Sequence, residues 1–283
     1  MKIFRILIDV VLVAAALSCA QASAESKKIV RYQDQAGAVH YGLVKEDKVH
    51  QLKGGIAEFA RSKYELDGKI IPLAHIKILA PVEPSKVINF GWTYPQHAQE
   101  VGGQVQRNDP LVFLKPPTVI IAHRDTIRYP HGLSRQVEFE GELAIIIGKR
   151  AKNLAPDNAL DCVLGYTCFN DVTARDLTQS DPEFTRGKGF DTFGPLGPWI
   201  VTAIDPRDLR LTTTLNGAKK QDARTSQMSY GIPFLISYIS QVMTLNPGDV
   251  IATGTPAGSA AMKPGDVVKI EIEHIGELVN YVK

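Results

Sequence analysis

The chain has 283 residues, of which 44% are hydrophobic and 22% are charged, and its formal net charge is +2 at pH 7. These values are ordinary for a globular protein of one large or two modest domains. A charge so close to zero gives no electrostatic reason to expect a nucleic-acid partner, and no basic cluster suits an anionic membrane surface.

The N-terminus has the features of a secretory signal peptide. A short basic region precedes an apolar run at 10–17, and residues 22–24 form an A-x-A cleavage site. The apolar run is too short to remain as a membrane anchor. The alternative is lipoprotein processing at Cys19. We therefore expect residues 1–24 to be removed and the mature protein to be exported, either periplasmic or secreted.

Residues 25–80 are predicted to form a small β-rich domain. Its strand-like pieces alternate with turn signals and lie at 29–32, 38–44 and 49–52. A short helix is expected near 56–64. The proline-bearing connector at 79–84 then leads into a larger domain at 86–283.

The larger domain contains many short apolar runs that are typical of strands. These runs lie at 87–90, 112–114, 119–122, 143–147, 164–169 and 199–202. Matched Pro-Gly-Asp-Val turns at 247–250 and 264–267 precede two later strands, and each Pro-Gly pair suits a turn in which glycine takes a positive φ. An amphipathic pattern predicts one helix over 233–243. The domain is therefore expected to be strand-rich.

Two cysteines would remain after cleavage of the signal, Cys162 and Cys168. They lie in a segment that reads as one extended strand, which would separate their Cα atoms by ~20 Å. That distance is far beyond the reach of a disulfide. We expect two buried free thiols.

Carboxylates at alternating positions run into the apolar segment 143–147. A period of two places Glu138, Glu140 and Glu142 on one face of a strand, where like charges repel each other beside a buried run. A divalent cation would relieve this cost, and Asp171, after a second apolar strand, could complete a site for Mg²⁺, Mn²⁺ or Ca²⁺. No His/Cys pair lies at the spacing that zinc requires. The alternative is a solvated strand face.

Three further patterns could carry chemistry. His97 and Glu100 share one face of a helical turn, where the carboxylate could orient the histidine to activate water, or they could be a surface pair. Lys188 lies between two glycines and could stabilise an enolate beside a metal, or it could be a solvated loop lysine. The turn at 253–258 could hold a carboxylate or be a plain tight turn.

Four ordered segments together resemble the fumarylacetoacetate hydrolase family from about Val87 to Val282. These segments are 140–144, 165–177, 188–195 and 247–256. The resemblance implies an α+β, β-rich fold, with a mixed β-sandwich roll that follows a small N-terminal β domain. It also implies a homodimer.

The resemblance implies a role for each matching residue. The family's metal ligands, normally for Mg²⁺ or Mn²⁺ with Ca²⁺ also possible, correspond to Glu140, Glu142 and Asp171. Glu138 then becomes a neighbour of the site. Catalytic roles, including a His-x-x-Glu pair on a mobile lid, correspond to His97, Glu100 and Lys188. Substrate-binding roles correspond to Lys115, Arg175 and Thr255.

The chain departs from the family pattern at two places. It has Thr93-Tyr94 where the family often has Asn-Tyr before the lid histidine, and it has Thr178 and then Gln179 where glutamine often comes first. Both positions tend to contact substrate in the family. These departures therefore bear on which substrate is bound.

The resemblance implies a divalent-metal-dependent hydrolase that cleaves a C–C bond in a small 1,3-dicarbonyl substrate, such as an acylpyruvate or a fumarylacetoacetate-like compound. One alternative is an isomerase, hydratase or decarboxylase that acts on an unsaturated 2-oxo or 2-hydroxy dioic acid at the same site. A further alternative is a non-catalytic exported module that binds oxo acids.

Overall fold

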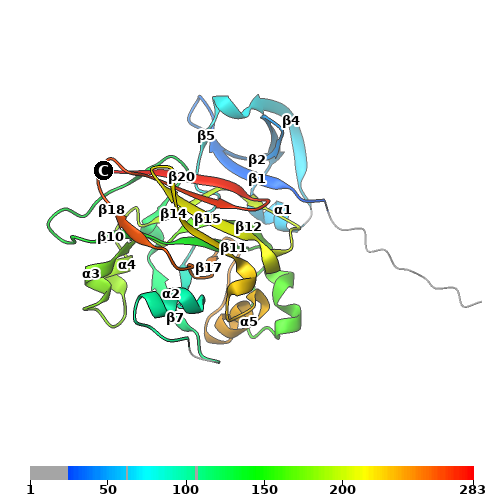
Figure 1. Ribbon diagram of the computed structural model, residues 1–283. Coiled ribbons are helices and arrows are strands. Elements are labelled where there is room, and N and C mark those ends of the chain that lie inside the picture. The colour runs from blue at the N-terminus through cyan, green and yellow to red at the C-terminus, as the bar shows by residue number, and fades with distance from the viewer. Residues whose placement is uncertain (1–24, 62, 106–107) are drawn as a thin grey trace, which may run out of the picture.

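The computed structural model describes residues 25–61, 63–105 and 108–283, and Figure 1 shows their arrangement. The predicted signal segment 1–24, including Cys19, lies outside the described residues. Strands supply most of the regular structure, and the helices are few and short. The α+β, β-rich class predicted from the sequence is therefore confirmed.

The N-terminal residues form an antiparallel meander in the order β4-β3-β2-β1, drawn blue to cyan in Figure 1. Its elements are β1 (Lys28–Gln33), β2 (Val39–Lys45), β3 (Lys48–Lys53), α1 (Ile56–Ala60), β4 (Glu65–Pro72), η1 (Leu73–His75) and β5 (Lys77–Ile78). Helix α1 is shorter than the predicted 56–64. The meander is continuous with the rest of the molecule because Ile29 of β1 pairs with Ile200 of β14.

The central sheet continues from β1 through β14, β12, β11, β17, β6 and β7. These strands are β14 (Gly194–Val201), β12 (Val163–Asn170), β11 (Gly141–Ile147), β17 (Val250–Ala252), β6 (Val87–Gly91) and β7 (Leu111–Lys115). The short strand β8 (Ile120–Ile121) pairs with β14, and η2 (Pro117–Val119) precedes it. Every residue of β11 is buried, because this strand has neighbours on both edges and is covered on both faces. Continuous apolar sequence at 143–147 is what such a position requires.

Two further sheets complete the fold. The five-stranded sheet consists of β16 (Ala218–Arg224), β15 (Arg210–Leu215), β19 (Val267–Ile272), β20 (Gly276–Val282) and β9 (Thr126–Ile127). The three-stranded sheet consists of β13 (Thr173–Ala174), β10 (Val137–Phe139) and β18 (Ala260–Met262). Strands β15, β19 and β20 pack against β11, β12 and β14, and Leu143, Ile145 and Ile270 share the core between the two layers. This is the sandwich that the family resemblance implies.

The helix predicted over 233–243 is confirmed as α5 (Ile232–Val242). Its Leu235, Ile236 and Ile239 pack into the main core. The other short helices are α2 (Pro95–Glu100), α3 (Arg175–Thr178), α4 (Thr185–Lys188), η3 (Pro156–Cys162), η4 (Pro206–Asp208) and η5 (Thr225–Gln227). Among the described residues, no helix is both long enough and apolar enough to cross a membrane. The two cysteines are buried free thiols, as predicted.

The single strand expected for the alternating carboxylates is divided in two. Glu138 lies in β10 of the three-stranded sheet, whereas β11 of the central sheet begins at Gly141. Glu140 lies at the change of sheet, where its N–H donates to the Asn170 side chain over 3.0 Å. A Cβ on Gly141 would lie 2.3 Å from the Thr213 hydroxyl, so the close passage beneath β15 requires glycine. All three glutamates nevertheless line one cavity.

Below neutral pH, His123 is expected to destabilise the fold. Its Nδ1 accepts a hydrogen bond from Val279 N–H over 3.1 Å, and burial, aided by Arg124, lowers the pKa of His123 to about 4. The unfolded chain takes up this proton near pH 6.5, before the folded chain does, so stability falls between pH 6.5 and pH 4. Because His123 is only partly buried, solvent screens its charge. We therefore expect the free energy of unfolding to fall by about 2 kcal/mol, which is less than the whole pKa difference would give.

The variant His123→Asn tests this expectation, because an amide oxygen can accept the same hydrogen bond without titrating. Urea unfolding at pH 7 and pH 4.5 should show a smaller loss of stability for the variant than for the wild type. Equal losses in the two proteins would show that other groups govern the acid range.

Candidate active site

A cavity of about 360 Å³ lies where the central and three-stranded sheets meet. Its walls come from β6, α2, β7, β10, β11, α3, α4 and the loop before β18. Its charged side chains are Glu100, Glu138, Glu140, Glu142, Asp171, Arg175 and Lys188. Aromatic side chains cover another part of the wall: Phe90, Trp92, Phe113 and Phe184. Carboxylates outnumber cations in this list, so the cavity is suited to an added positive charge.

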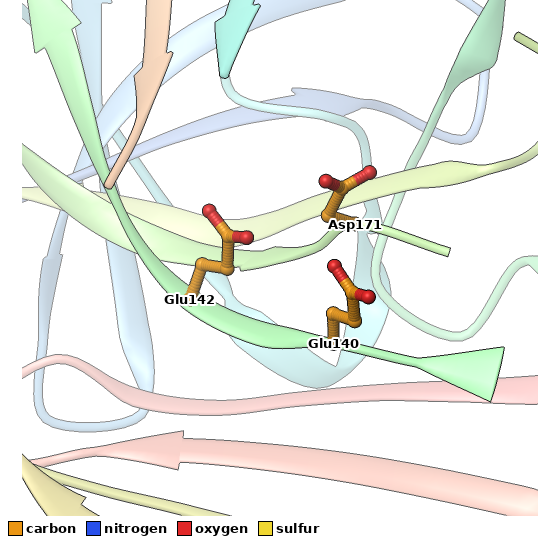
Figure 2. Close-up of side chains that lie close together, drawn as sticks. All are labelled: Glu140, Glu142 and Asp171. Atoms are coloured by element: carbon orange, nitrogen blue, oxygen red, sulfur yellow. The ribbon is translucent and has the colours of Figure 1, made fainter. Parts of the chain in front are cut away.

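Three of these carboxylates form a compact oxygen cluster, shown in Figure 2. Glu140, Glu142 and Asp171 are all buried, and each offers one oxygen within 4.8 Å of the others. Hard divalent cations bind oxygen at roughly 2.0–2.6 Å, so ligands on opposite sides of such an ion lie roughly 4–5 Å apart. The cluster therefore fits Mg²⁺, Mn²⁺ or Ca²⁺ in the size and the chemistry of its donors.

Two of the three carboxylates are already paired with cationic side chains. The Lys188 Nζ donates to Glu140 Oε2 over 2.7 Å and to Asp171 Oδ2 over 2.6 Å. Arg175 donates to the other oxygen of Glu140, and Lys115 donates to the other oxygen of Asp171. Burial opposes ionisation of Glu140, but Lys188 and Arg175 outweigh it and hold the pKa of Glu140 below its usual range.

Glu142 is in a different electrostatic situation. It accepts a hydrogen bond from Gly254 N–H over 2.8 Å, and among the described residues it forms no ion pair. Burial, together with the charges of Asp171 and Glu140, raises the pKa of Glu142 well above its usual range. A divalent cation would supply the positive charge that this carboxylate lacks. This imbalance is the strongest indication of a metal site in the structure.

Gly254 cannot be replaced without disturbing Glu142. Its φ is +96°, and a Cβ would lie 2.0 Å from the Thr93 hydroxyl and 2.9 Å from the Phe90 carbonyl. We expect Gly254→Ala to destabilise the protein by roughly 2–4 kcal/mol, from strain and overpacking together, and to weaken metal binding. Urea unfolding and a Mn²⁺ titration measure the two effects.

Gly248→Ala is the matched control for this substitution. Gly248 has a φ of +88°, but a Cβ there would meet nothing within 4 Å. Only the left-handed backbone then carries a penalty, roughly 1 kcal/mol, and metal binding should not change. If the two variants behaved alike, the close contact at Gly254 would have no consequence for the site.

His97 and Glu100 lie together on α2, on one face as the spacing predicted. The Nδ1 atom of His97 is 3.1 Å from Glu100 Oε2, and its Nε2 atom is 3.9 Å from Glu140 Oε1. A carboxylate at Nδ1 favours the tautomer that leaves Nε2 unprotonated, so the basic nitrogen faces the carboxylate cluster. Both Glu100 oxygens also accept from Gly258 N–H, over 3.2 and 3.1 Å, which ties α2 to the loop before β18.

The predicted substrate-binding residues occupy three different settings. Arg175 lines the cavity, where its Nε donates to Glu138 Oε2 over 2.9 Å while its other end contacts Glu140. Glu138 is thus a neighbour of the cluster, as the resemblance implies. Lys115 is not among the lining residues. It is fully buried behind Asp171 and also donates to the Val172 carbonyl over 3.0 Å.

Thr255 lines the cavity, but its hydroxyl is already engaged. It donates to the Gly141 carbonyl over 2.9 Å and accepts from the Gln221 side chain over 2.8 Å. Gln221 also accepts from Gly141 N–H over 3.1 Å. Contact between this hydroxyl and a substrate carboxylate would therefore require a change of partner.

Sequence reasoning did not identify Gln221 as part of the site. The one local signal is the burial pattern of β16, in which Gln221 and Ala223 are buried while most other positions are exposed.

The two departures from the family pattern lie in different settings. Thr93 is buried, donates to the Thr253 carbonyl over 2.7 Å and does not line the cavity, whereas Thr178 and Gln179 do. Of the two departures, the one at 178–179 can act directly on a substrate.

Family models match nearly the whole described chain. The model described as fumarylacetoacetate (FAA) hydrolase C-terminal matches residues 86–283, and the one described as Rv2993c-like, N-terminal matches residues 27–81. The β-rich sandwich, the buried carboxylate cluster and the family match therefore agree. The chain belongs to the fumarylacetoacetate hydrolase family.

Two curated relatives cover most of the chain. Protein Rv2993c of Mycobacterium tuberculosis is 50% identical over 230 residues, which make up 80% of this chain and 86% of that protein. Oxaloacetate tautomerase YisK of Bacillus subtilis is 35% identical over 270 residues, which make up 90% of each chain.

Two solved structures are also similar over 90% of this chain and 98% of their own. One is 2-hydroxyhepta-2,4-diene-1,7-dioate isomerase from Mycobacterium marinum, at 41% identity and a TM-score of 0.82. The other is maleylpyruvate hydrolase from Sphingobium sp. SYK-6 in complex with manganese (II) ion and pyruvate, at 32% identity and a TM-score of 0.75. The named relatives include a tautomerase, an isomerase and a hydrolase, so the family supports an enzyme but does not fix the reaction.

Proposed function

We propose that this chain is a divalent-metal-dependent enzyme that acts on a small 2-oxo acid or 1,3-dicarbonyl compound. One observation carries the proposal: a buried carboxylate cluster, in which Glu142 lacks a cation, faces His97 across the same cavity. The complete set of carboxylates, lysine and His–Glu pair argues against a non-catalytic oxo-acid-binding module.

Each residue has a role that follows from its contacts. A divalent cation held by Glu140, Glu142 and Asp171 would polarise the substrate carbonyl and stabilise negative charge on an enolate oxygen. Lys188, which bridges two of these carboxylates, would add a positive charge that stabilises the same enolate.

The first candidate reaction is hydrolysis of a C–C bond. His97, oriented by Glu100, takes a proton from water at Nε2 while the water oxygen bonds to the substrate carbonyl carbon. The C–C bond then breaks, its electron pair forms the enolate of the 2-oxo acid, and the proton returns to that carbon. The products are a carboxylic acid and a 2-oxo acid.

The second candidate is tautomerisation or isomerisation at the same site, which transfers a proton without adding water. The names of the relatives support it beside hydrolysis, because a tautomerase at 35% and an isomerase at 41% identity accompany hydrolases at 32% and 36%. His97 would then move a proton directly to or from the substrate carbon. The hydratase and decarboxylase alternatives would use the same enolate.

Metal binding is tested first, and the reaction second. Mg²⁺ or Mn²⁺ at a hundredfold excess over Kd should stabilise the protein by about 2.7 kcal/mol, and oxalate, an enolate mimic, should add to the effect. Mass analysis then separates the reactions. Hydrolysis adds one water and yields two fragments, whereas tautomerisation conserves mass and exchanges solvent deuterium into the substrate. A protein that shows no metal response contradicts the proposal.

We also propose that the mature protein is exported and forms a homodimer. The signal-like segment 1–24 supports export, and the family resemblance supports the dimer. Cell fractionation and light scattering test the two points. Retention of the uncleaved chain in the cytosol, or a monomeric mass, would contradict them.

A further inference from the structure

Tyr94 carries a buried hydroxyl that has no hydrogen-bond partner among the described residues. The residue lies immediately before α2, and only 1% of it is exposed. A buried hydroxyl without a partner is unfavourable, and such groups in native proteins commonly serve a bound water, an ion or a function.

The surroundings of Tyr94 connect it to the one carboxylate of the cluster that lacks a cation. The residue before Tyr94 is Thr93, whose hydroxyl donates to the Thr253 carbonyl. Gly254, which follows Thr253 in the chain, donates its N–H to Glu142. The segment 93–94 therefore packs directly against the turn that holds Glu142. In agreement, burial and then the charge of Glu142 raise the pKa of Tyr94.

We infer that Tyr94 is a positioning residue of the metal site, whose hydroxyl donates a hydrogen bond to Glu142, directly or through one water, when the metal is bound. The bond would fix the orientation of the Glu142 carboxylate as a ligand. Partners of this kind typically change metal affinity by 10- to 100-fold when they are removed. The inference rests on the proposed metal-dependent function.

A purely structural tyrosine would behave in the opposite way. If Tyr94 only filled the core, removal of its hydroxyl would leave metal affinity unchanged. If its hydroxyl made an important bond in the metal-free protein, its removal would destabilise that form. A positioning role predicts neither result.

The test compares Tyr94→Phe with Thr167→Val in the full protein. Thr167 is the matched control, because its hydroxyl is also buried and unpartnered among the described residues but lies in β12 opposite Ala144. Both substitutions preserve the shape of the side chain. Isothermal titration with Mn²⁺ gives Kd, and thermal unfolding without metal gives the stability of the metal-free form.

We expect Tyr94→Phe to raise the Mn²⁺ Kd 10- to 100-fold while the metal-free protein unfolds at the same temperature or higher. Thr167→Val should leave Kd unchanged. A Tyr94→Phe protein with the Kd of the wild type would overturn the inference while the proposed function stands. A wild type that does not bind Mn²⁺ would overturn the proposed function itself.

A measurement on the wild type keeps the inference testable if Tyr94→Phe does not fold. Saturating Mg²⁺ should perturb the ultraviolet absorbance of a tyrosine, because the hydroxyl gains a hydrogen-bond partner. No tyrosine difference spectrum on Mg²⁺ binding would overturn the inference.

Discussion

Glu142→Gln is expected to abolish Mn²⁺ binding while the metal-free protein stays as stable as the wild type or becomes more stable. Glu142 is a buried carboxylate whose pKa is raised by burial and by two neighbouring carboxylates, so a neutral side chain of the same shape removes an unfavourable charge. The same substitution removes a ligand of the metal. Denaturant unfolding with and without Mn²⁺ measures both effects, and the Mn²⁺-dependent stabilisation of about 2.7 kcal/mol should disappear.

Glu140→Gln is the matched comparison, because it removes another ligand but has the opposite effect on the metal-free protein. Glu140 accepts hydrogen bonds from both Arg175 and Lys188, and loss of its charge weakens both ion pairs, which leaves Arg175 with Glu138 and Lys188 with Asp171. We expect a destabilisation of about 1.5–3 kcal/mol in addition to the loss of metal binding, because hydrogen bonds to a charged group are weakened while each cation keeps a second carboxylate. Equal stability of the two metal-free variants would show that the charge balance derived from the structure is wrong.

His97→Ala is expected to lower turnover roughly 10²- to 10⁴-fold while Mn²⁺ affinity stays within a few-fold of the wild type. His97 faces the cluster through Nε2 but is not one of its three carboxylates, so its removal takes away the proton-transferring group and leaves the ligands in place. Steady-state kinetics with the substrate found by mass analysis, together with a Mn²⁺ titration, give the two quantities.

Two further variants define the limits of that result. Glu100→Gln should lower turnover less than His97→Ala, because it weakens the orientation of the histidine and leaves the ring nitrogen. His131→Ala is a control outside the cavity and should change neither quantity. Equal losses of turnover and Mn²⁺ affinity in His97→Ala would contradict this division between the base and the metal ligands.

Local periodicity in the sequence was sufficient to predict part of this protein. The alternation of Glu138, Glu140 and Glu142 ahead of an apolar run predicted three side chains on one side, because side chains in a strand alternate with a period of two, and all three line one cavity. The three-residue spacing predicted that His97 and Glu100 would meet, and the amphipathic pattern predicted α5. The assignment of roles beyond these local relations came from the family resemblance.

Only the tertiary structure decided which distant groups share the site. Gln221 reaches Gly141 across 80 positions of the chain, and Lys115 reaches Asp171 across 56. The division of the carboxylate strand at Glu140, and the continuation of the N-terminal meander into the central sheet through β1 and β14, likewise depend on packing between segments far apart in sequence. Periodicity fixes which way a side chain points within its own element. Which partner it meets, and whether the hydroxyl of Tyr94 is left without one, is set by how the sheets pack, because the free energy of those contacts arises only when the distant segments come together.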